Sequence, residues 1–364
     1  MVGRAIAEDL AKEHSVCSFD LSKNNLDILR RSPEIQTQQI DLLKAIENLP
    51  ELLKDFDLIA LAVPGFMGFR CLEACIKSGK PIADISFFPE SSSLLDTLAK
   101  EHSTPVIVDC GVAPGMSNLI LGRFVPEFEV ENFECYVGGL PKERISPWEY
   151  KAPFSPIDVI EEYIRPARFV ENGKIVFKEA LTDRQEINFE GIGTLEAFNT
   201  DGLRSLIYSF PHILNMKEKT LRYPGYLDKI LMLKKLGFFC DKKVLADNTI
   251  SALDLTSKVL IDQWKLEEND PELTVMRVIV EGKKDVESKR IVYELFDEYD
   301  TETQTSSMAR TTAYTCTAMI KILEGGLIKQ GGIFPPENIG SNPDLFNLVL
   351  SHLAERGVNW KRTE

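Results

Sequence analysis

Gly3 and Asp20 have the residue types and the spacing of a dinucleotide site. Gly3 stands at the start of a helical stretch, and Asp20 ends the strand that the short apolar run VCSF (16–19) predicts after this helix. In a G-x-G-x-x-G turn the last glycine lets the helix pack closely on the strand. An acidic residue about 20 positions after the first glycine binds the ribose. If Gly3 is the last glycine of such a turn, Asp20 falls about 22 positions after the first. The alternative gives Gly3 no such role and makes Asp20 a helix cap.

The same residues favour one form of the nucleotide. A carboxylate at Asp20 would accept hydrogen bonds from both ribose hydroxyls and would repel a 2′-phosphate. We therefore expect NAD rather than NADP, although Lys23 lies close by. Asp41 could accept a hydrogen bond from the adenine amino group, or it could cap a helix. Because ligands of such folds bind beyond the carboxyl ends of the strands, further cofactor contacts are expected at Ala62, Val63, Pro64, Val112 and Pro114.

The elements that position these residues alternate between strand and helix. Helices are predicted over 68–78 and 91–102, and apolar runs predict strands at 16–19, 35–41, 57–63, 81–86 and 104–111. This alternation predicts an α/β fold, a Rossmann-type doubly wound parallel sheet covered on both faces. The pattern lacks its first strand, because the chain opens on a helix. We expect Met1 to be an internal residue of a longer protein, and we expect this form to bind NAD weakly.

After about residue 124 the pattern changes to longer strands separated by Gly/Asn/Asp turns, which predicts a mixed or antiparallel sheet. Helices interrupt it at 156–165, 202–210, 226–237 and 250–263. A helix of small residues follows from Ser306 and ends at Gly325-Gly326. We predict a dinucleotide-binding domain at 1–115, an α+β substrate domain at 116–305, and a C-terminal helical segment at 306–364 that returns to the first domain.

The composition argues against several classes of protein. The 364 residues carry a formal charge of -14, which disfavours a nucleic-acid partner. No apolar run approaches the roughly 18 residues of a membrane span. The 7 cysteines are scattered and odd in number, as is typical of reduced thiols, so we expect a cytoplasmic protein. Cys71 and Cys75 lack a second pair at ligand spacing, which predicts a core role and no metal site.

The turn DCGVAPGMSNLILGR at 109–123 leaves a strand and enters a helix whose backbone N–H groups could face a nicotinamide or a carboxylate. This run resembles the D-x-G-x-x-P-G-x-x-N signature of the saccharopine dehydrogenase-like family, in particular its lysine 6-dehydrogenase branch. Other stretches agree with it: YVGGLP (136–141), RPARFVENGK (165–174), LEAFNTDGLRS (195–205), LRYPG (221–225), MARTTAYT (308–315) and GGIFPPE (331–337). The resemblance implies NAD(P)-linked oxidation at a carbon that bears nitrogen, and a homodimer or larger homo-oligomer.

The resemblance also discriminates between branches. Fungal-type saccharopine reductases have Asp where this chain has Ala113, and Cys where it has Val137. Both are polar groups near their active site, so the apolar residues favour oxidation at the ε-amine of lysine by NAD. A saccharopine- or carboxynorspermidine-type C–N dehydrogenase is the alternative. An N-terminally truncated, inactive nucleotide-fold protein is a further one.

Oxidation of an amine requires a proton acceptor and a cation that holds the substrate carboxylate. Arg204 could bind that carboxylate, while Asp201 could hold an ammonium group or simply stand in a turn. Tyr150 could relay a proton, or it could be a packed loop aromatic. Further positions that could line the pocket are Phe87, Arg222, Arg310 and Thr311. Their structural alternatives are core packing for Phe87, pairing for Arg222 and capping for the other two.

Overall fold

The computed structural model describes residues 1–364 apart from 31, 33, 244–249 and 268–269. The chain divides into two compact units. The first consists of Met1–Glu127 and Ala309–Asn359, and the second of Phe128–Met308 and Trp360–Glu364. The predicted boundary after residue 115 thus falls before a helix that groups with the first unit, and the last residues of the chain group with the second.

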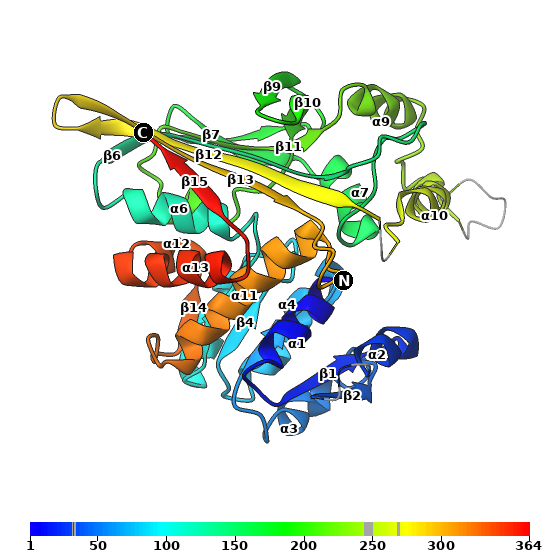
Figure 1. Cartoon of the computed structure of the whole chain (residues 1–364), viewed down its shortest axis with the longest axis vertical. Helices are drawn as coiled ribbons and strands as arrows, with labels where there is room; N and C mark the ends of the chain where they lie inside the picture. The colour runs from blue at the N-terminus through cyan, green and yellow to red at the C-terminus, as the bar shows by residue number, and fades with distance from the viewer. Residues whose placement is uncertain (31, 33, 244–249, 268–269) are drawn as a thin grey trace. The chain divides into compact units, whose positions relative to one another are not determined.

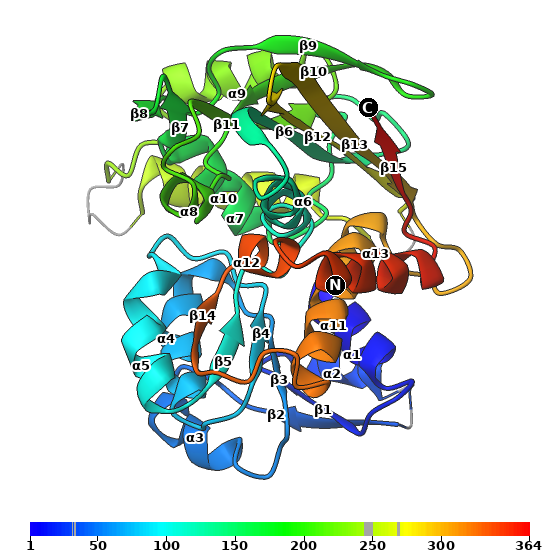
Figure 2. The ribbon, with the colours of Figure 1, turned by 90° about the vertical axis from the view of Figure 1, so that its left-hand side faces the viewer.

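Parallel strands form the centre of the first unit. β1 (Val16–Asp20) pairs with β2 (Ile35–Gln39). A second sheet has the order β14-β5-β4-β3, from Gly332–Phe334, Pro105–Ile107, Ile82–Asp84 and Ile59–Leu61 (Figure 2). Because every pair is parallel and helices lie between the strands, the predicted α/β fold class is confirmed. Among the described residues, β1 and β3 do not pair, so the parallel strands form two separate sheets. In the doubly wound strand order, the position between these two strands is that of the first strand.

The helices of the first unit follow the predicted order. α4 begins at Gly65, three residues before the prediction, because Pro64 takes the N-cap position. The predicted helix over 91–102 is a 3-10 turn at Ser92–Leu95 followed by α5. The bounds are α1 Val2–Leu10, α2 Lys23–Leu29, α3 Leu49–Leu52 after a 3-10 turn at Ile46–Asn48, α4 Gly65–Ile76, α5 Asp96–Glu101, α6 Met116–Phe124, α11 Ser307–Glu324, α12 Pro336–Gly340 and α13 Pro343–Glu355. From Ala309 on, α11 groups with this unit.

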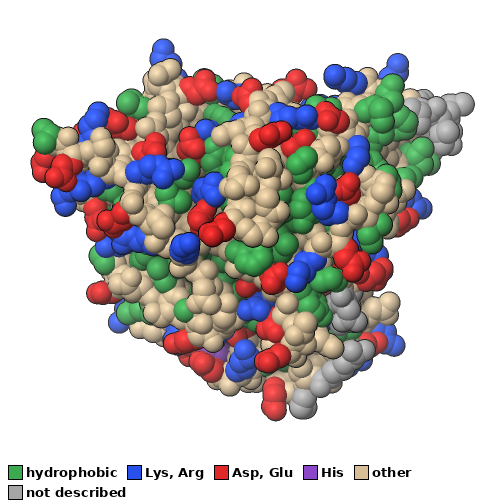
Figure 3. All heavy atoms as spheres, turned by 45° about the horizontal axis from the view of Figure 1, so that its top comes forward, with side chains coloured by type: hydrophobic (Ala, Val, Ile, Leu, Met, Phe, Trp, Pro, Cys, Tyr) green, Lys and Arg blue, Asp and Glu red, His purple; other side chains and the backbone are tan. Residues whose placement is uncertain are grey.

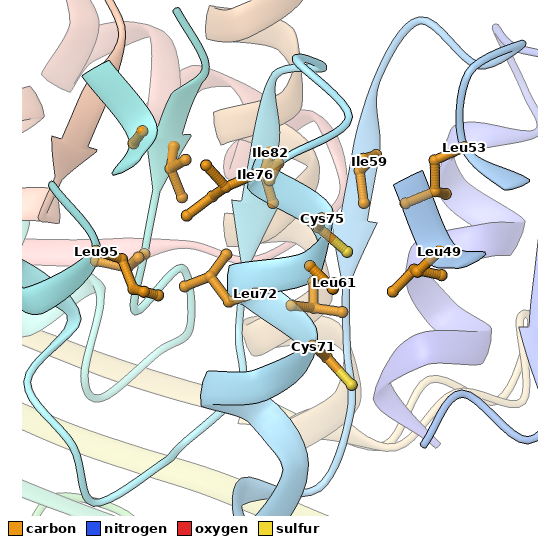
Figure 4. Close-up of a cluster of buried hydrophobic side chains, with 14 of the residues drawn as sticks. Leu49, Leu53, Ile59, Leu61, Cys71, Leu72, Cys75, Ile76, Ile82 and Leu95 are labelled. Atoms are coloured by element: carbon orange, nitrogen blue, oxygen red, sulfur yellow. The ribbon is translucent and has the colours of Figure 1, made fainter. Parts of the chain in front are cut away.

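The core of this unit settles the role of two cysteines. Figure 4 shows Cys71 and Cys75 one turn apart on α4, on the side where Ile59 and Leu61 of β3 lie. Both thiols are buried, and burial raises the pKa of Cys71 to about 11. A thiol that keeps its proton is a poor metal ligand. The predicted core role is confirmed, and the described residues contain no group of three or more metal-ligating side chains.

In the described part of the chain, the second unit is built on a mixed sheet of nine strands. Figure 1 shows this sheet with its labels. Its order is β15-β13-β12-β6-β11-β10-β9, and β7 pairs with β11 and β8. β6 and β11 run parallel, whereas β12 is antiparallel to β6 and β10 is antiparallel to β11. The strands are β6 Glu129–Pro141, β7 Ala167–Glu171, β8 Lys174–Lys178, β9 Gln185–Phe189, β10 Gly193–Asn199, β11 Asn215–Arg222, β12 Glu272–Lys284, β13 Glu287–Glu298 and β15 Trp360–Thr363.

The helices of the second unit are α7 Pro156–Ile164, α8 Leu206–Ser209, α9 Tyr226–Lys235 and α10 Ala252–Trp264. Of these, α8 is much shorter than the predicted helix over 202–210. Acidic and basic side chains intermingle over the face drawn in Figure 3. In the part of the chain that the structure describes, no helix combines the length and apolarity needed to span a bilayer.

Candidate functional site

The predicted nucleotide residues of the first unit surround the start of α1. Gly3 lies in the first turn of that helix, and a Cβ atom added to it would be 3.7 Å from the Cβ of Ala62. Ala62 follows β3 directly and begins the loop Ala62–Pro64 that leads into α4. The start of α1 therefore packs against the carboxyl end of a parallel strand, where nucleotides bind in such folds.

Asp20 ends β1 as predicted, and its carboxylate has local partners. One oxygen accepts from the backbone N–H of Ser22 at 2.6 Å and the other from the side-chain amide of Asn25 at 3.0 Å. These bonds resemble the alternative helix-cap role. A carboxylate offers about four acceptor sites, however, so a ribose contact by the partly exposed Asp20 stays a prediction.

Asp41 lies two residues beyond the end of β2 at Gln39, so it does not close that strand. Its carboxylate accepts from the backbone N–H of Lys44 at 3.2 Å and pairs with the ammonium group of the same residue at 3.1 Å. The hydrogen bonds from the Lys44 side chain and backbone lower the pKa of Asp41. These bonds lie within a turn, because the next helical residues begin only at Ile46, so they do not cap a helix. The adenine contact of Asp41 stays a prediction.

The turn that follows β5 is held by hydrogen bonds among its own residues. Gly115 has φ +142°, and a Cβ atom added to it would lie 1.8 Å from the carbonyl oxygen of Gly111, so only glycine fits. The Gly111 N–H donates to the carbonyl of Pro114 at 3.1 Å. The N–H groups of Met116 and Gly115 donate to Gly111 O and Asn118 Oδ1 at 3.0 and 3.4 Å.

The expectation that the N–H groups at the start of α6 point to a ligand is therefore wrong for Gly115 and Met116. Val112 is buried in this turn, whereas Ala113 and Pro114 are partly exposed. Of the three, Ala113 and Pro114 present the larger surface to a ligand.

Three predicted pocket residues, Phe87, Arg310 and Thr311, lie in the first unit. Arg310 donates from its guanidinium to the carbonyl of Arg356 at 2.8 Å, just beyond α13, which fits its alternative capping role. Thr311 is 1 % exposed, so it is closed to solvent. Phe87 is partly buried, and the next aromatic, Phe88, packs edge-on against Phe69 with ring centroids 5.7 Å apart. A pocket role for these three residues stays a prediction.

In the second unit, one face of the central sheet brings predicted residues together. Val137 on β6 is in register with Thr220 on the parallel strand β11, so their side chains lie on the same face. The hydroxyl of Thr220 is 2.8 Å from that of Thr200, which follows β10. Val137, which replaces a cysteine of the fungal-type reductases, therefore lies next to a pair of buried hydroxyl groups.

The loop after Thr200 is held by tertiary contacts. Asp201 is 4 % exposed, and its carboxylate accepts from the Arg168 backbone and from two guanidinium nitrogens at 2.8–3.2 Å. Gly202 packs closely on the Glu218 side chain. A Cβ atom added to Gly202 would lie only 1.7 Å from Glu218 Oε1. Arg204 is 7 % exposed and has φ +52°, a conformation that costs about 1–3 kcal/mol for a residue other than glycine.

These contacts explain why the predicted helix over 202–210 begins only at Leu206. They also give Asp201 a cation from its own chain. Its predicted role as an ammonium ligand stays a prediction, and it would require the pair with Arg168 to open.

Tyr150 and Arg222 belong to one buried aromatic cluster. The Arg222 guanidinium donates to the hydroxyls of Tyr150 and Tyr163 at 3.2 and 3.1 Å and lies 4.3 Å from the centroid of the Tyr150 ring. The Tyr163 hydroxyl is 3.0 Å from that of Tyr226, and Trp264 packs against all three tyrosines. Burial raises the pKa of Tyr150 well above its ordinary value, so its proton stays in place. The structure fits the alternative of a packed loop aromatic.

Sequence reasoning missed two residues near these groups. Glu162 on α7 precedes Tyr163, and burial raises the pKa of its carboxyl to about 7, against the opposing effect of Arg222. Arg168 stands 33 residues from Asp201, its ion-pair partner. A pKa near neutrality marks Glu162 as a possible proton acceptor, because such shifts concentrate at functional sites. No local pattern in the sequence distinguishes either residue from an ordinary surface charge.

Comparison with known proteins gives a consistent family. Residues 1–109 match the model of the saccharopine dehydrogenase NADP binding domain, and residues 111–358 match that of the saccharopine dehydrogenase C-terminal domain. A mitochondrial alpha-aminoadipic semialdehyde synthase of Bos taurus is 26% identical over 231 residues, which cover 59% of this chain and 25% of the relative. A saccharopine dehydrogenase [NADP(+), L-glutamate-forming] of Schizosaccharomyces pombe is 26% identical over 202 residues, covering 52% of this chain and 45% of the relative.

Two solved structures share the fold. Apo saccharopine dehydrogenase (L-Glu forming) from Saccharomyces cerevisiae has a TM-score of 0.79 at 16% identity, covering 100% of this chain and 98% of that one. Homospermidine synthase from Legionella pneumophila, in complex with NAD, has a TM-score of 0.67 at 11% identity, covering 100% and 89%. The chain spans about a quarter of the length of the curated relatives that it matches first. With two domain models that match in order over nearly its whole length, the chain belongs to the saccharopine dehydrogenase family.

Proposed function

We propose that this chain is a pyridine-nucleotide-dependent oxidoreductase that acts on a C–N bond of a lysine-related amino acid. The observation that carries the proposal is the ordered match of residues 1–109 and 111–358 to the two saccharopine dehydrogenase domain models. The packing of Gly3 against Ala62 at the carboxyl end of β3 supports nucleotide binding in the first unit. We favour the ε-amine of L-lysine as the reacting group.

The chemistry follows from the substrate. The neutral amine loses a hydride from its ε-carbon, and the nitrogen lone pair forms the C=N bond of an iminium ion. When bound, the nucleotide supplies the hydride acceptor. Water then adds to the iminium carbon, ammonia leaves, and the resulting semialdehyde cyclises. Because lysine amines are protonated at neutral pH, the protein has to take up a proton first.

The second unit offers groups for these tasks. Arg204 is our candidate for the substrate carboxylate, since a guanidinium binds a carboxylate through two hydrogen bonds. Its left-handed backbone is of the strained kind that concentrates at functional sites. Glu162, whose pKa burial raises to about 7, is our candidate for the proton acceptor.

The alternative substrate is saccharopine or another secondary amine, and the names of the curated relatives favour it. Ala113 and Val137 support lysine, because the resemblance places polar groups at both positions in the fungal-type reductases. For the nucleotide, Asp20 supports NAD, whereas the description of the matching domain model supports NADP. We propose NAD, with the partly exposed carboxylate of Asp20 facing the ribose.

The test measures reduction of NAD and NADP with lysine, saccharopine and carboxynorspermidine, each supplied alone. We expect NADH production with lysine. No signal with lysine, together with NADPH production from saccharopine, would overturn the lysine assignment but keep the reaction class. The variant that combines Ala113→Asp with Val137→Cys should shift the ratio of kcat/KM values toward saccharopine. An unchanged ratio would show that these two positions do not select the substrate.

A further inference from the structure

A connected polar network joins three helices of the first unit near the C-terminal end of α1. Asp9 lies in the last turn of α1, Thr317 lies in α11, His352 lies near the end of α13, and Arg356 follows α13 directly. The Thr317 hydroxyl donates to Asp9 Oδ2 at 2.7 Å. Arg356 Nε lies 2.9 and 2.7 Å from the two oxygens of Asp9. The same Thr317 oxygen is 2.8 Å from Nε2 of His352.

The network is buried, and its protonation is fixed. Asp9 and His352 are each 4% exposed. Burial raises the pKa of Asp9, but the hydrogen bonds from Thr317, Arg356 and Lys12 outweigh it, so the pKa lies below its ordinary value. Burial and the neighbouring guanidinium lower the pKa of His352 to about 4. Asp9 is therefore charged and His352 neutral at physiological pH.

The hydrogen-bond directions follow from these charges. Thr317 has one proton, and it donates that proton to the carboxylate of Asp9. It must then accept from His352, which places the imidazole proton on Nε2. This leaves Nδ1 of His352 as an acceptor, buried and without a hydrogen-bond partner among the described residues. His352, Asp9, Thr317 and Arg356 line one small pocket with room for a hydrogen-bond donor of the size of water.

α1 depends on tertiary contacts, of which this network is the polar part. The helix has only 9 residues, of which Ala5, Ile6, Ala7 and Asp9 are buried. A helix this short is marginal without tertiary contacts. Gly3 lies six positions before Asp9, or about 9 Å along the axis at the helical rise of 1.5 Å per residue. Any rotation or shift of α1 about Asp9 therefore moves Gly3 relative to Ala62.

We infer that Asp9 is a positioning residue for the nucleotide. Held by Arg356 and Thr317, it fixes the rotation and axial position of α1, and so the place of the Gly3 turn that approaches the nucleotide. This inference rests on the proposed nucleotide binding by the first unit. In this arrangement the C-terminal helices α11 and α13 hold the end of α1 that lies away from the nucleotide.

The experiment compares dissociation constants for NADH and NADPH, measured by the fluorescence of the reduced nicotinamide, in the full chain and its variants. Asp9→Asn removes the charge that pairs with Arg356. Thr317→Val removes only the hydroxyl and keeps the ion pair, so it remains informative if the first variant fails to fold. We expect each variant to bind the nucleotide roughly tenfold more weakly, within the range of coupling between distant sites. Arg356→Lys, which keeps the charge, should retain most of the affinity.

Asp96→Asn is the matched control. Asp96 accepts from the backbone N–H of Ile333 at 3.0 Å and pairs with Lys100, so its loss weakens the same unit away from α1. This variant should lower the melting temperature and leave the dissociation constant unchanged. Equal nucleotide affinity in the parent, Asp9→Asn and Thr317→Val would overturn the inference while nucleotide binding stands. If the parent itself binds neither nucleotide, it is the proposed function that fails.

Discussion

The partly buried carboxyl of Glu162 should make the stability of the second unit depend on pH. Its pKa is about 7 in the folded protein, where burial raises it, against an ordinary value of 4.5. Between these two values the folded state binds the proton more tightly than the unfolded state. The free energy of unfolding should therefore fall as pH rises from 4.5 to 7, and Glu162 should contribute no further change above that.

The size of the effect follows from the same shift. One pKa unit corresponds to about 1.4 kcal/mol, so a shift from 4.5 to about 7 amounts to roughly 3.5 kcal/mol at full burial. Glu162 is only partly buried, so screening by solvent makes this an upper bound. Glu162→Gln mimics the protonated form. It should match the parent near pH 4.5 and exceed it in stability by up to that amount at pH 8.

The assay is urea unfolding at several pH values, followed by tryptophan fluorescence. All 3 tryptophans of the chain, Trp148, Trp264 and Trp360, belong to the second unit, so the signal reports on that unit. The control is Glu161→Gln, which changes the exposed neighbour on the same helix and should keep the slope of the parent. If Glu162→Gln has the same pH dependence as the parent, the carboxyl does not titrate near 7 and is no candidate for the proton acceptor.

Three further substitutions probe the second unit, with stability again followed by tryptophan fluorescence. Arg168→Ala leaves the buried Asp201 without its cation and should cost about 3–5 kcal/mol, whereas a loss below 1 kcal/mol would mean that the pair is not structural. Tyr150→Phe removes one partner of a hydrogen bond at 3.2 Å and should cost about 1 kcal/mol while kcat stays within about threefold; a 100-fold lower kcat would restore Tyr150 as a proton relay. Gly202→Ala forces Glu218 away from an added Cβ and should cost about 1–3 kcal/mol, and unchanged stability would contradict the close approach.

The sequence predicted the elements of the first unit well because their signals are local. Parallel strands are marked by short apolar runs: β4 lies within the predicted range 81–86, and β1 covers the predicted run 16–19 and ends at Asp20. The core role of Cys71 and Cys75 followed from a different signal, the lack of a second ligand pair at metal-binding spacing. The predicted end of the second strand at residue 41 was two residues too late, because strand ends are set by tertiary context rather than by hydrophobicity.

The candidate site was less predictable because its contacts join distant parts of the chain. Arg168 and Asp201 are 33 positions apart, and Asp9 and Arg356 are 347 apart. Neither pair leaves a periodic pattern, since a charged residue on an exposed face and one in a buried pair look alike in a single sequence. The surroundings of Tyr150 could not be read from the sequence for the same reason. Its hydroxyl partner Arg222 lies 72 positions away, at the end of β11.

The loop at 200–205 shows why such failures point to function. Sequence periodicity favours a helix from residue 202, yet the chain forms a loop that Arg168, Thr220 and Glu218 hold in place. Within it Arg204 adopts a left-handed backbone that a helix would have avoided. The contacts of Thr200, Asp201 and Gly202 offset this cost of about 1–3 kcal/mol at Arg204. Because strained residues that are held in place in this way concentrate at functional sites, we propose this loop, rather than the buried tyrosine cluster, as the place where the second unit binds its substrate.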